Sequence, residues 1–181
     1  MYRAIGWAIP IFLTSFLFSC TTLLDSDSGE MNELSVDGFS METDQAVYLI
    51  DENDNSLEIN YAYVNESNKD FYPGSCVGIP TENLEKLVDG KWILAYTPAC
   101  QFKLGPPLKI NRGDRYEVVI QLPLSMLNSV EQNSFWKGGD IEGFYRVREQ
   151  VYAEWDTEKY DNNTLQSVIV VSNAFEIRKK P

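Results

Sequence analysis

Carboxylates are the most numerous side chains in this sequence that could do chemistry. The 181 residues hold 27 Asp and Glu against 15 Lys and Arg, with no histidine. Two carboxyl groups about 5 to 10 Å apart could hydrolyse a glycosidic bond, but with so many acidic residues any given pair is more typical of surface charge. The lack of histidine excludes Ser-His-Asp and Cys-His catalysis and histidine-bearing zinc sites. Three cysteines exclude a four-cysteine zinc site, and no glycine-rich phosphate loop occurs.

We therefore predict no catalytic residues, no cofactor and no metal site, and a carboxylate-dependent hydrolase is the least favoured function. One acidic run leaves an alternative open. Asp51-Glu52-Asn53-Asp54-Asn55 could supply oxygen ligands to calcium. It departs from the EF-hand loop at Ser56, where a glycine belongs, and at Ala62, where a glutamate belongs. A polar turn between two strands accounts for the same residues.

Aromatic residues could instead bind a ligand through their flat faces. Five of them gather late in the chain: Trp136, Tyr145, Tyr152, Trp155 and Tyr160. Aromatic residues that alternate along strands usually pack in the core, as we expect of Trp92. Trp155 and Tyr160 differ because the segment 153–164 around them is polar, which predicts a long loop. They are the candidates for ligand-facing aromatics.

The first nineteen residues have the pattern of an export signal. Arg3 precedes an apolar stretch, 4–18, that is too short for a typical membrane-spanning helix. The stretch ends in Leu17-Phe18-Ser19-Cys20, which resembles the lipobox of bacterial lipoproteins, although Phe18 is larger than usual. The resemblance implies that Cys20 is lipidated, becomes the first mature residue and attaches the protein to a membrane. Thr21 favours the outer membrane, on its periplasmic or surface face.

Lipidation of Cys20 would leave an even number of cysteines in an oxidising compartment. Cys76 and Cys100 could then form a disulfide, which would stabilise the fold by about 3 kcal/mol. The alternative is two buried thiols. Removing residues 1–19 leaves 14 basic against 27 acidic residues, a formal net charge of −13. Such a surface repels phosphate groups, so we expect no nucleic-acid partner.

Beyond a polar tether at 20–35, residues 36–181 have the pattern of one β-domain. Apolar residues alternate over 57–64 and over 115–122, where Tyr116, Val118, Ile120 and Leu122 should point inward. Asp89-Gly90 predicts a type I′ turn between strands at 84–88 and 91–95. Further strands are expected at 36–43, 46–50, 70–73, 107–111, 143–152 and 166–177. The segment 124–136 could be a short helix or an inserted loop. This pattern favours an antiparallel β-sandwich over a small barrel.

Gly143-Phe144-Tyr145-Arg146-Val147 suggests the tyrosine corner of an immunoglobulin-like sandwich, in which Tyr145 bonds back to a nearby backbone group. The order of four segments strengthens that suggestion: Ala46-Val47-Tyr48, Val64-Asn65-Glu66-Ser67, the stretch 84–92, and 143–147. It resembles the bacterial immunoglobulin-like domains of small envelope lipoproteins. The resemblance implies no catalytic residues. The leading hypothesis is a non-enzymatic, lipid-anchored envelope module that contacts a protein or a glycan; a glycan- or calcium-handling accessory of an uptake system is the alternative.

Overall fold

The structure, a computed structural model, describes residues 32–33, 35–51, 53–76, 79–80, 83–98, 107–124 and 136–181. Its strands and helix are β1 Asn32–Glu33, β2 Ser35–Val36, β3 Phe39–Thr43, β4 Val47–Ile50, β5 Ser56–Asn65, β6 Tyr72–Pro73, β7 Ser75–Cys76, β8 Ile79–Pro80, β9 Asn83–Val88, β10 Lys91–Tyr96, β11 Arg115–Pro123, β12 Gly143–Tyr152, α2 Thr157–Asp161, β13 Val168–Val171 and β14 Phe175–Lys179. Within these ranges, no helix has the length and apolar character needed to cross a membrane.

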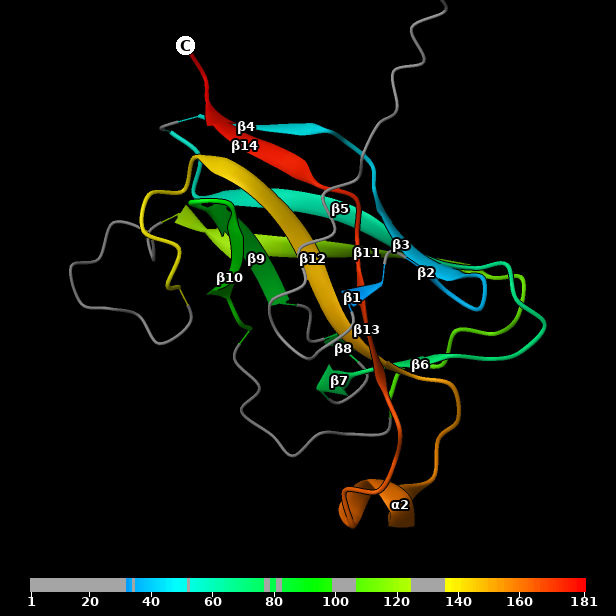
Figure 1. The fold of residues 1–181 in the computed structure, drawn as a ribbon. Helices are drawn as coiled ribbons and strands as arrows, with labels where there is room; N and C mark the ends of the chain where they lie inside the picture. The colour runs from blue at the N-terminus through cyan, green and yellow to red at the C-terminus, as the bar shows by residue number, and fades with distance from the viewer. Residues whose placement is uncertain are drawn as a thin grey trace, which may run out of the picture.

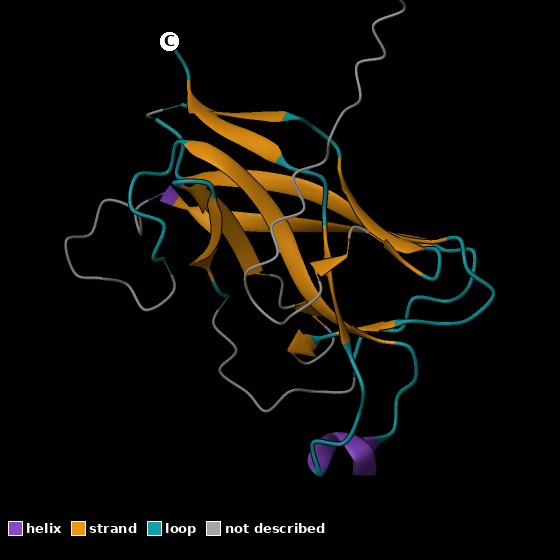
Figure 2. Ribbon diagram, viewed as in Figure 1, coloured by secondary structure: helices purple, strands orange, loops and turns teal. Residues whose placement is uncertain are grey.

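Two β-sheets enclose one core, which confirms the predicted all-β sandwich (Figures 1 and 2). The sandwich is not wholly antiparallel as predicted, because β1 pairs with β13, and β4 with β14, in parallel. Sheet A follows the order β1-β13-β12-β14-β4, with β9 and β6 also paired to β12, and β10 paired to β9. Sheet B follows the order β11-β5-β3-β2, and β7 with β8 forms a small separate ribbon. The strand β12 is the centre of sheet A, since four other strands pair with parts of it.

Sheet B is built on the two strands whose alternation was clearest. β5 and β11 pair antiparallel over nine residues. The pairing begins with Arg115 opposite Val64 and ends with Pro123 opposite Ser56. Leu57 and Ile59 are buried as predicted. Tyr116 was wrongly predicted to be buried: it lies near the end of the strand pair, where the core no longer covers it, and is 41% exposed.

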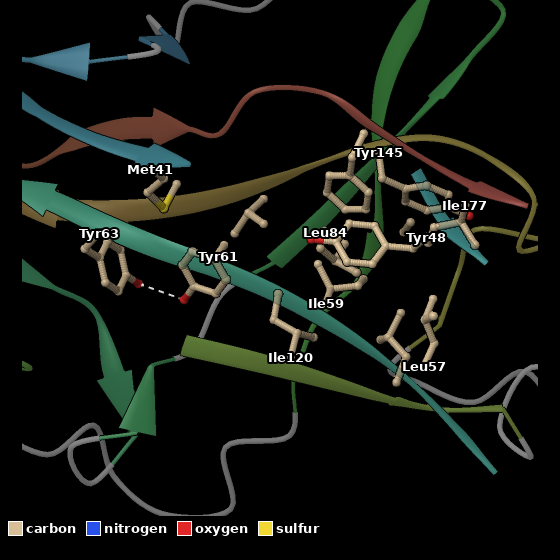
Figure 3. Close-up of a cluster of buried hydrophobic side chains, with 14 of the residues drawn as sticks. Met41, Tyr48, Leu57, Ile59, Tyr61, Tyr63, Leu84, Ile120, Tyr145 and Ile177 are labelled. Atoms are coloured by element: carbon tan, nitrogen blue, oxygen red, sulfur yellow. Dashed lines mark hydrogen bonds between the residues drawn. The ribbon is translucent and has the colours of Figure 1, made fainter. Parts of the chain in front are cut away.

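The core is filled by the inward side chains of both sheets (Figure 3). Tyr48, Tyr145 and Ile177 come from sheet A and meet Ile59 and Ile120 of sheet B. The alternation of a half-buried strand explains this arrangement, because every second side chain points to the same face. Side chains between them, such as those of Arg146 and Arg148 in β12, therefore lie on the outer face of sheet A, away from sheet B.

The hairpin at Asp89-Gly90 is confirmed. Asp89 has φ 51° and Gly90 has φ 79°, the positive values that a type I′ turn requires. β9 then pairs with β12, so the hairpin extends sheet A. Trp92 was wrongly placed in the core: it lies on the outer face, where the guanidinium of Arg146 stands 4.5 Å from its ring centroid.

Three expected strands differ in the structure. The segment 36–43 is divided by a tight turn at Asp37, with φ 49°, and Gly38, with φ 83°, so it forms β2 and β3 rather than one strand. Residues 166–177 run along β12 but divide into β13 and β14, because Ser172 interrupts the pairing and its hydroxyl accepts a hydrogen bond from the Val147 amide. In 107–111, only Ile110 forms a bridge, to Phe71.

The hydrogen bond predicted for Tyr145 is present. Its buried hydroxyl donates to the carbonyl oxygen of Ile141 at 2.6 Å. Val147, two residues later, is fully buried. Residues 125–135, most of the segment expected to hold a helix or an insert, lie outside the described residues.

Candidate binding site

A hollow of about 160 Å³ lies over the last residues of β12, between the β6–β7 segment and α2. We call it the β12 hollow. Its walls combine aromatic rings with polar groups. The lining residues are Gly74, Ser75, Asn83, Pro107, Arg148, Glu149, Gln150, Tyr152, Trp155 and Tyr160. Both aromatics selected from the sequence, Trp155 and Tyr160, are therefore part of one site.

The helix α2 carries one wall of this hollow, in the segment that was expected to be a loop. Asp156 caps the helix, because its carboxylate accepts a hydrogen bond from the Lys159 amide at 3.0 Å. Glu158 in the first turn adds a favourable charge at the same end. A helix of five residues has little stability of its own, so its packing through Tyr160 must hold it in place.

The aromatic wall is a cluster of three rings. The ring centroids of Trp155 and Tyr160 are 4.8 Å apart, and each ring meets Tyr152 nearly edge-on, at 5.7 and 6.2 Å. These contacts fix the orientation of the rings and leave Trp155 and Tyr160 half-buried. The other late aromatics do not join them: Tyr145 is in the core, and Trp136 packs against it with centroids 6.2 Å apart.

The polar wall depends on an arginine and glutamate network that the sequence analysis did not identify. Glu85 of β9 accepts a hydrogen bond from Nε of Arg146 at 2.6 Å and forms an ion pair with Arg148, whose Nε is 3.3 Å from the carboxylate. Because β9 pairs with β12, Arg146 lies directly opposite Glu85. The alternation of 143–152 could have placed both arginines on the outer face, but only the register of β9 shows which anion meets them.

Gln150 is also held in place by hydrogen bonds. Gln150 donates through its side-chain Nε2 to the Ser167 hydroxyl at 2.6 Å. Its backbone N–H donates to Oε1 of Glu149 at 2.8 Å. Burial, followed by the nearby Tyr160 and Glu149, raises the pKa of Tyr152, so its hydroxyl stays protonated at neutral pH. The hollow thus offers hydrogen-bonding groups around a fixed aromatic surface, which suits binding rather than proton transfer.

A second hollow, on the outer face of sheet B, contains carboxylates that a hydrolase would need. Glu42 and Glu117 both line it, and Arg115 lies between them. The guanidinium is 3.0 Å from Glu42 and 3.6 Å from Glu117. Glu42 beside Arg115 raises the pKa of the guanidinium above its usual value. Both glutamates are therefore ion-paired with the same arginine.

The acidic run at 51–55 adopts the arrangement of a polar turn in its described part. The Asp51 carboxylate accepts from the backbone and side-chain nitrogens of Asn53, at 3.0 and 2.9 Å, and from Lys180 at 3.3 Å. Hydrogen bonding to Asn53 and Lys180 lowers the pKa of Asp51. Across the described ranges, no three acidic or cysteine side chains gather as metal ligands would. Glu52 lies outside them.

Two of the three cysteines lie outside the described residues. Neither Cys20 nor Cys100 has a described position, so lipidation and the disulfide both stay predictions. Cys76 ends β7, where its backbone pairs with Ile79. Its neighbour Ser75 lines the β12 hollow.

The sequence matches no protein-family model and no curated protein. Among solved structures, a β-glucosidase from Listeria innocua in complex with gluconolactone is similar over 77% of this chain, with 11% identity and a TM-score of 0.32. The chain spans 16% of that enzyme's length. The CARDB domain of a Pyrococcus furiosus protein, in complex with two metal ions, is similar over 81% of this chain and 99% of its own, with 12% identity and a TM-score of 0.24.

Proposed function

We propose that this protein is a non-enzymatic binding module of the bacterial envelope, anchored through a lipid on Cys20, and that its β12 hollow holds part of a glycan. The observation that carries the proposal is the convergence of a three-ring aromatic wall with Asn83, Arg148 and Gln150 around one hollow. Sugar rings present apolar C–H faces and a rim of hydroxyl groups. Aromatic faces and hydrogen-bonding side chains match these two surfaces.

The size of the hollow fits a small recognition site. Its volume of about 160 Å³ equals the space of about five water molecules, which suits one sugar ring of a longer chain. Both the aromatic and the polar walls are held by contacts within the protein, which lowers the entropic cost of binding.

We further propose that the sandwich is of the immunoglobulin-like type. The hydrogen bond from Tyr145 to Ile141 and the buried Val147 support this assignment, since they form the local arrangement of a tyrosine corner. Immunoglobulin-like modules commonly bind through surface residues on a rigid β-scaffold. The β12 hollow, built on the central strand of sheet A, is such a surface.

Glycan binding can be tested with the soluble mature domain carrying Cys20→Ser. We expect it to bind a subset of saccharides on a printed array, with affinities then measured by tryptophan fluorescence titration. Trp155→Ala should weaken binding about thirtyfold, the effect of removing a contact worth about 2 kcal/mol. Phe144→Ala, which removes an exposed aromatic elsewhere on sheet A, is the matched control and should bind like the wild type. Absence of saccharide binding, or equal binding by Trp155→Ala, would refute the proposal.

The anchor is tested separately in the full-length protein. Cys20→Ser should abolish palmitate labelling and membrane fractionation when the protein is expressed in a bacterium. A Cys20→Ser protein that still incorporates palmitate would disprove lipidation at this residue.

A further inference from the structure

The strand β1 shows where the tether joins the domain. Asn32 pairs with Ile169 of β13, and Ile169 in turn pairs with Gln150 of β12, a residue that lines the β12 hollow. Neighbouring strands are about 4.8 Å apart. The backbone at Asn32 is therefore about 10 Å from the strand segment beneath the hollow.

The direction of β1 shows which end of sheet A its first residue faces. β1 runs parallel to β13, from the level of Gln150 toward the level of Glu149. The N-terminal end of β1 therefore points toward the end of β12 that carries the hollow. The opposite end of β12 lies beside the β9–β10 hairpin; Figure 1 shows α2 and this hairpin turn at opposite ends of the strand. Ten residues of β12 separate these ends by about 30 Å.

The length of the tether limits the distance between the domain and the bilayer. Eleven residues lie between Cys20 and Asn32. Fully extended, the chain from Cys20 to Asn32 reaches about 40 Å, and as a flexible coil it averages about 20 Å. With Cys20 in the membrane, the hollow would stay close to the lipid headgroups, while the hairpin end would lie about 30 Å farther out.

The charges indicate which headgroup could be bound. The chain has a formal net charge of −12, which disfavours anionic ligands. Two charged residues line the hollow. Arg148 lies on the outer face and is paired with Glu85, whereas Glu149 is only 3% exposed and belongs to the inward-facing positions of β12. Outside it, Lys159 of α2 pairs with Glu154 at 2.7 Å, and Glu158 and Asp161 are exposed nearby. These surroundings suit a neutral saccharide better than a phosphate or a carboxylate.

We infer that the β12 hollow faces the membrane that carries the protein and binds a neutral saccharide borne by that membrane, such as a glycolipid headgroup. The inference rests on the proposed anchor and glycan site and adds the source of the ligand. It follows from the position of β1, the length of the tether and the charge of the site.

The ligand source can be tested with vesicles made from the total lipid extract of the strain that encodes the protein. The soluble domain with Cys20→Ser should be retained on these vesicles, and periodate oxidation of their sugars should abolish retention. Trp155→Ala should need about thirtyfold more lipid for half-retention, whereas Phe144→Ala should match the wild type. Retention that survives periodate, or no retention by a domain that binds saccharides on an array, would overturn the inference. A domain that binds saccharides in neither format would instead contradict the proposed glycan function.

The orientation has its own test in the lipidated full-length protein. A fluorescent residue is incorporated in place of Glu158, on α2, or of Lys91, beside the hairpin turn, and energy transfer to an acceptor lipid is measured in phosphatidylethanolamine vesicles. Transfer should be more efficient from position 158. Equal transfer, or greater transfer from position 91, would show that the hollow does not face the bilayer.

Discussion

Replacing Glu85 with Gln should lower the free energy of unfolding by about 2 to 4 kcal/mol. The carboxylate pairs with Arg146 and Arg148, and the three side chains are only 11%, 13% and 20% exposed. Gln keeps the size of the side chain but removes its charge, so two guanidinium groups would share a partly desolvated site with no anion between them. Breaking a fully buried pair costs about 3 to 5 kcal/mol, and the remaining solvent contact reduces that cost here.

Urea denaturation of the soluble domain would measure this loss, as a lower midpoint with an unchanged m-value. Thermal unfolding should show a melting temperature lower by about 2 to 4 °C for each kcal/mol. Asp37→Asn is the matched control. It also removes an ion pair, with Lys69 at 2.5 Å, but those side chains are 65% and 40% exposed, so the loss should be below about 1 kcal/mol. If Glu85→Gln were no more destabilising than Asp37→Asn, the network would not stabilise the fold. Glu85→Gln should also weaken saccharide binding, because Arg148 lines the hollow.

Three further predictions concern the core, the cysteines and acid stability. Tyr145→Phe should lower the free energy of unfolding by about 1 to 3 kcal/mol, because the buried carbonyl of Ile141 loses its hydrogen-bond donor. An unchanged midpoint in urea denaturation would contradict this. Cys76 and Cys100 should react with a thiol-alkylating reagent only after reduction, and equal labelling without reductant would rule out their disulfide. Hydrogen bonding to Lys109 lowers the pKa of Asp70 in the folded state. The ionised Asp70 therefore stabilises the fold at any pH above its unfolded pKa of about 3.9. This contribution is lost as the pH falls through the lower, folded pKa. Asp70→Asn should therefore reduce the loss of stability between pH 4 and pH 2 in acid titrations followed by circular dichroism, and an unchanged acid profile would contradict it.

Local patterns predicted the strands well where one face is buried. The alternation in 57–64 and 143–152 and the Asp-Gly turn each depend on neighbouring residues, so they can be recognised in a sequence. Asp37 and Gly38 also have positive φ values. Because Asp-Gly pairs favour such turns, this pair could have predicted the turn between β2 and β3. The division at Ser172 is different, because it depends on a hydrogen bond from Val147, a residue 25 positions away.

The site was only partly predictable, because its aromatic half is local in sequence and its polar half is not. Trp155 and Tyr160 stand five residues apart in a polar segment, which is why they could be selected. Glu85 is about 60 positions from Arg146 and Arg148, and it meets them only because β9 pairs with β12. The burial of Lys86 could not be predicted from local sequence either. Its side chain is 8% exposed and donates to the carbonyl oxygen of Gly138 at 3.2 Å, although alternation alone would place an apolar residue there.

The two outer faces of the sandwich differ in a way that supports binding on sheet A. On sheet B, outward residues form exposed pairs such as Arg115 with Glu42, which water can replace at little cost. On sheet A, the outward Arg146 is held between Glu85 and the ring of Trp92. Holding these side chains in place has an entropic cost that solubility does not require, since exposed charges alone would keep the face hydrated. A fixed outer face also reduces the entropy lost when a ligand binds, so the network that stabilises the fold would also favour the recognition that we propose at the adjoining β12 hollow.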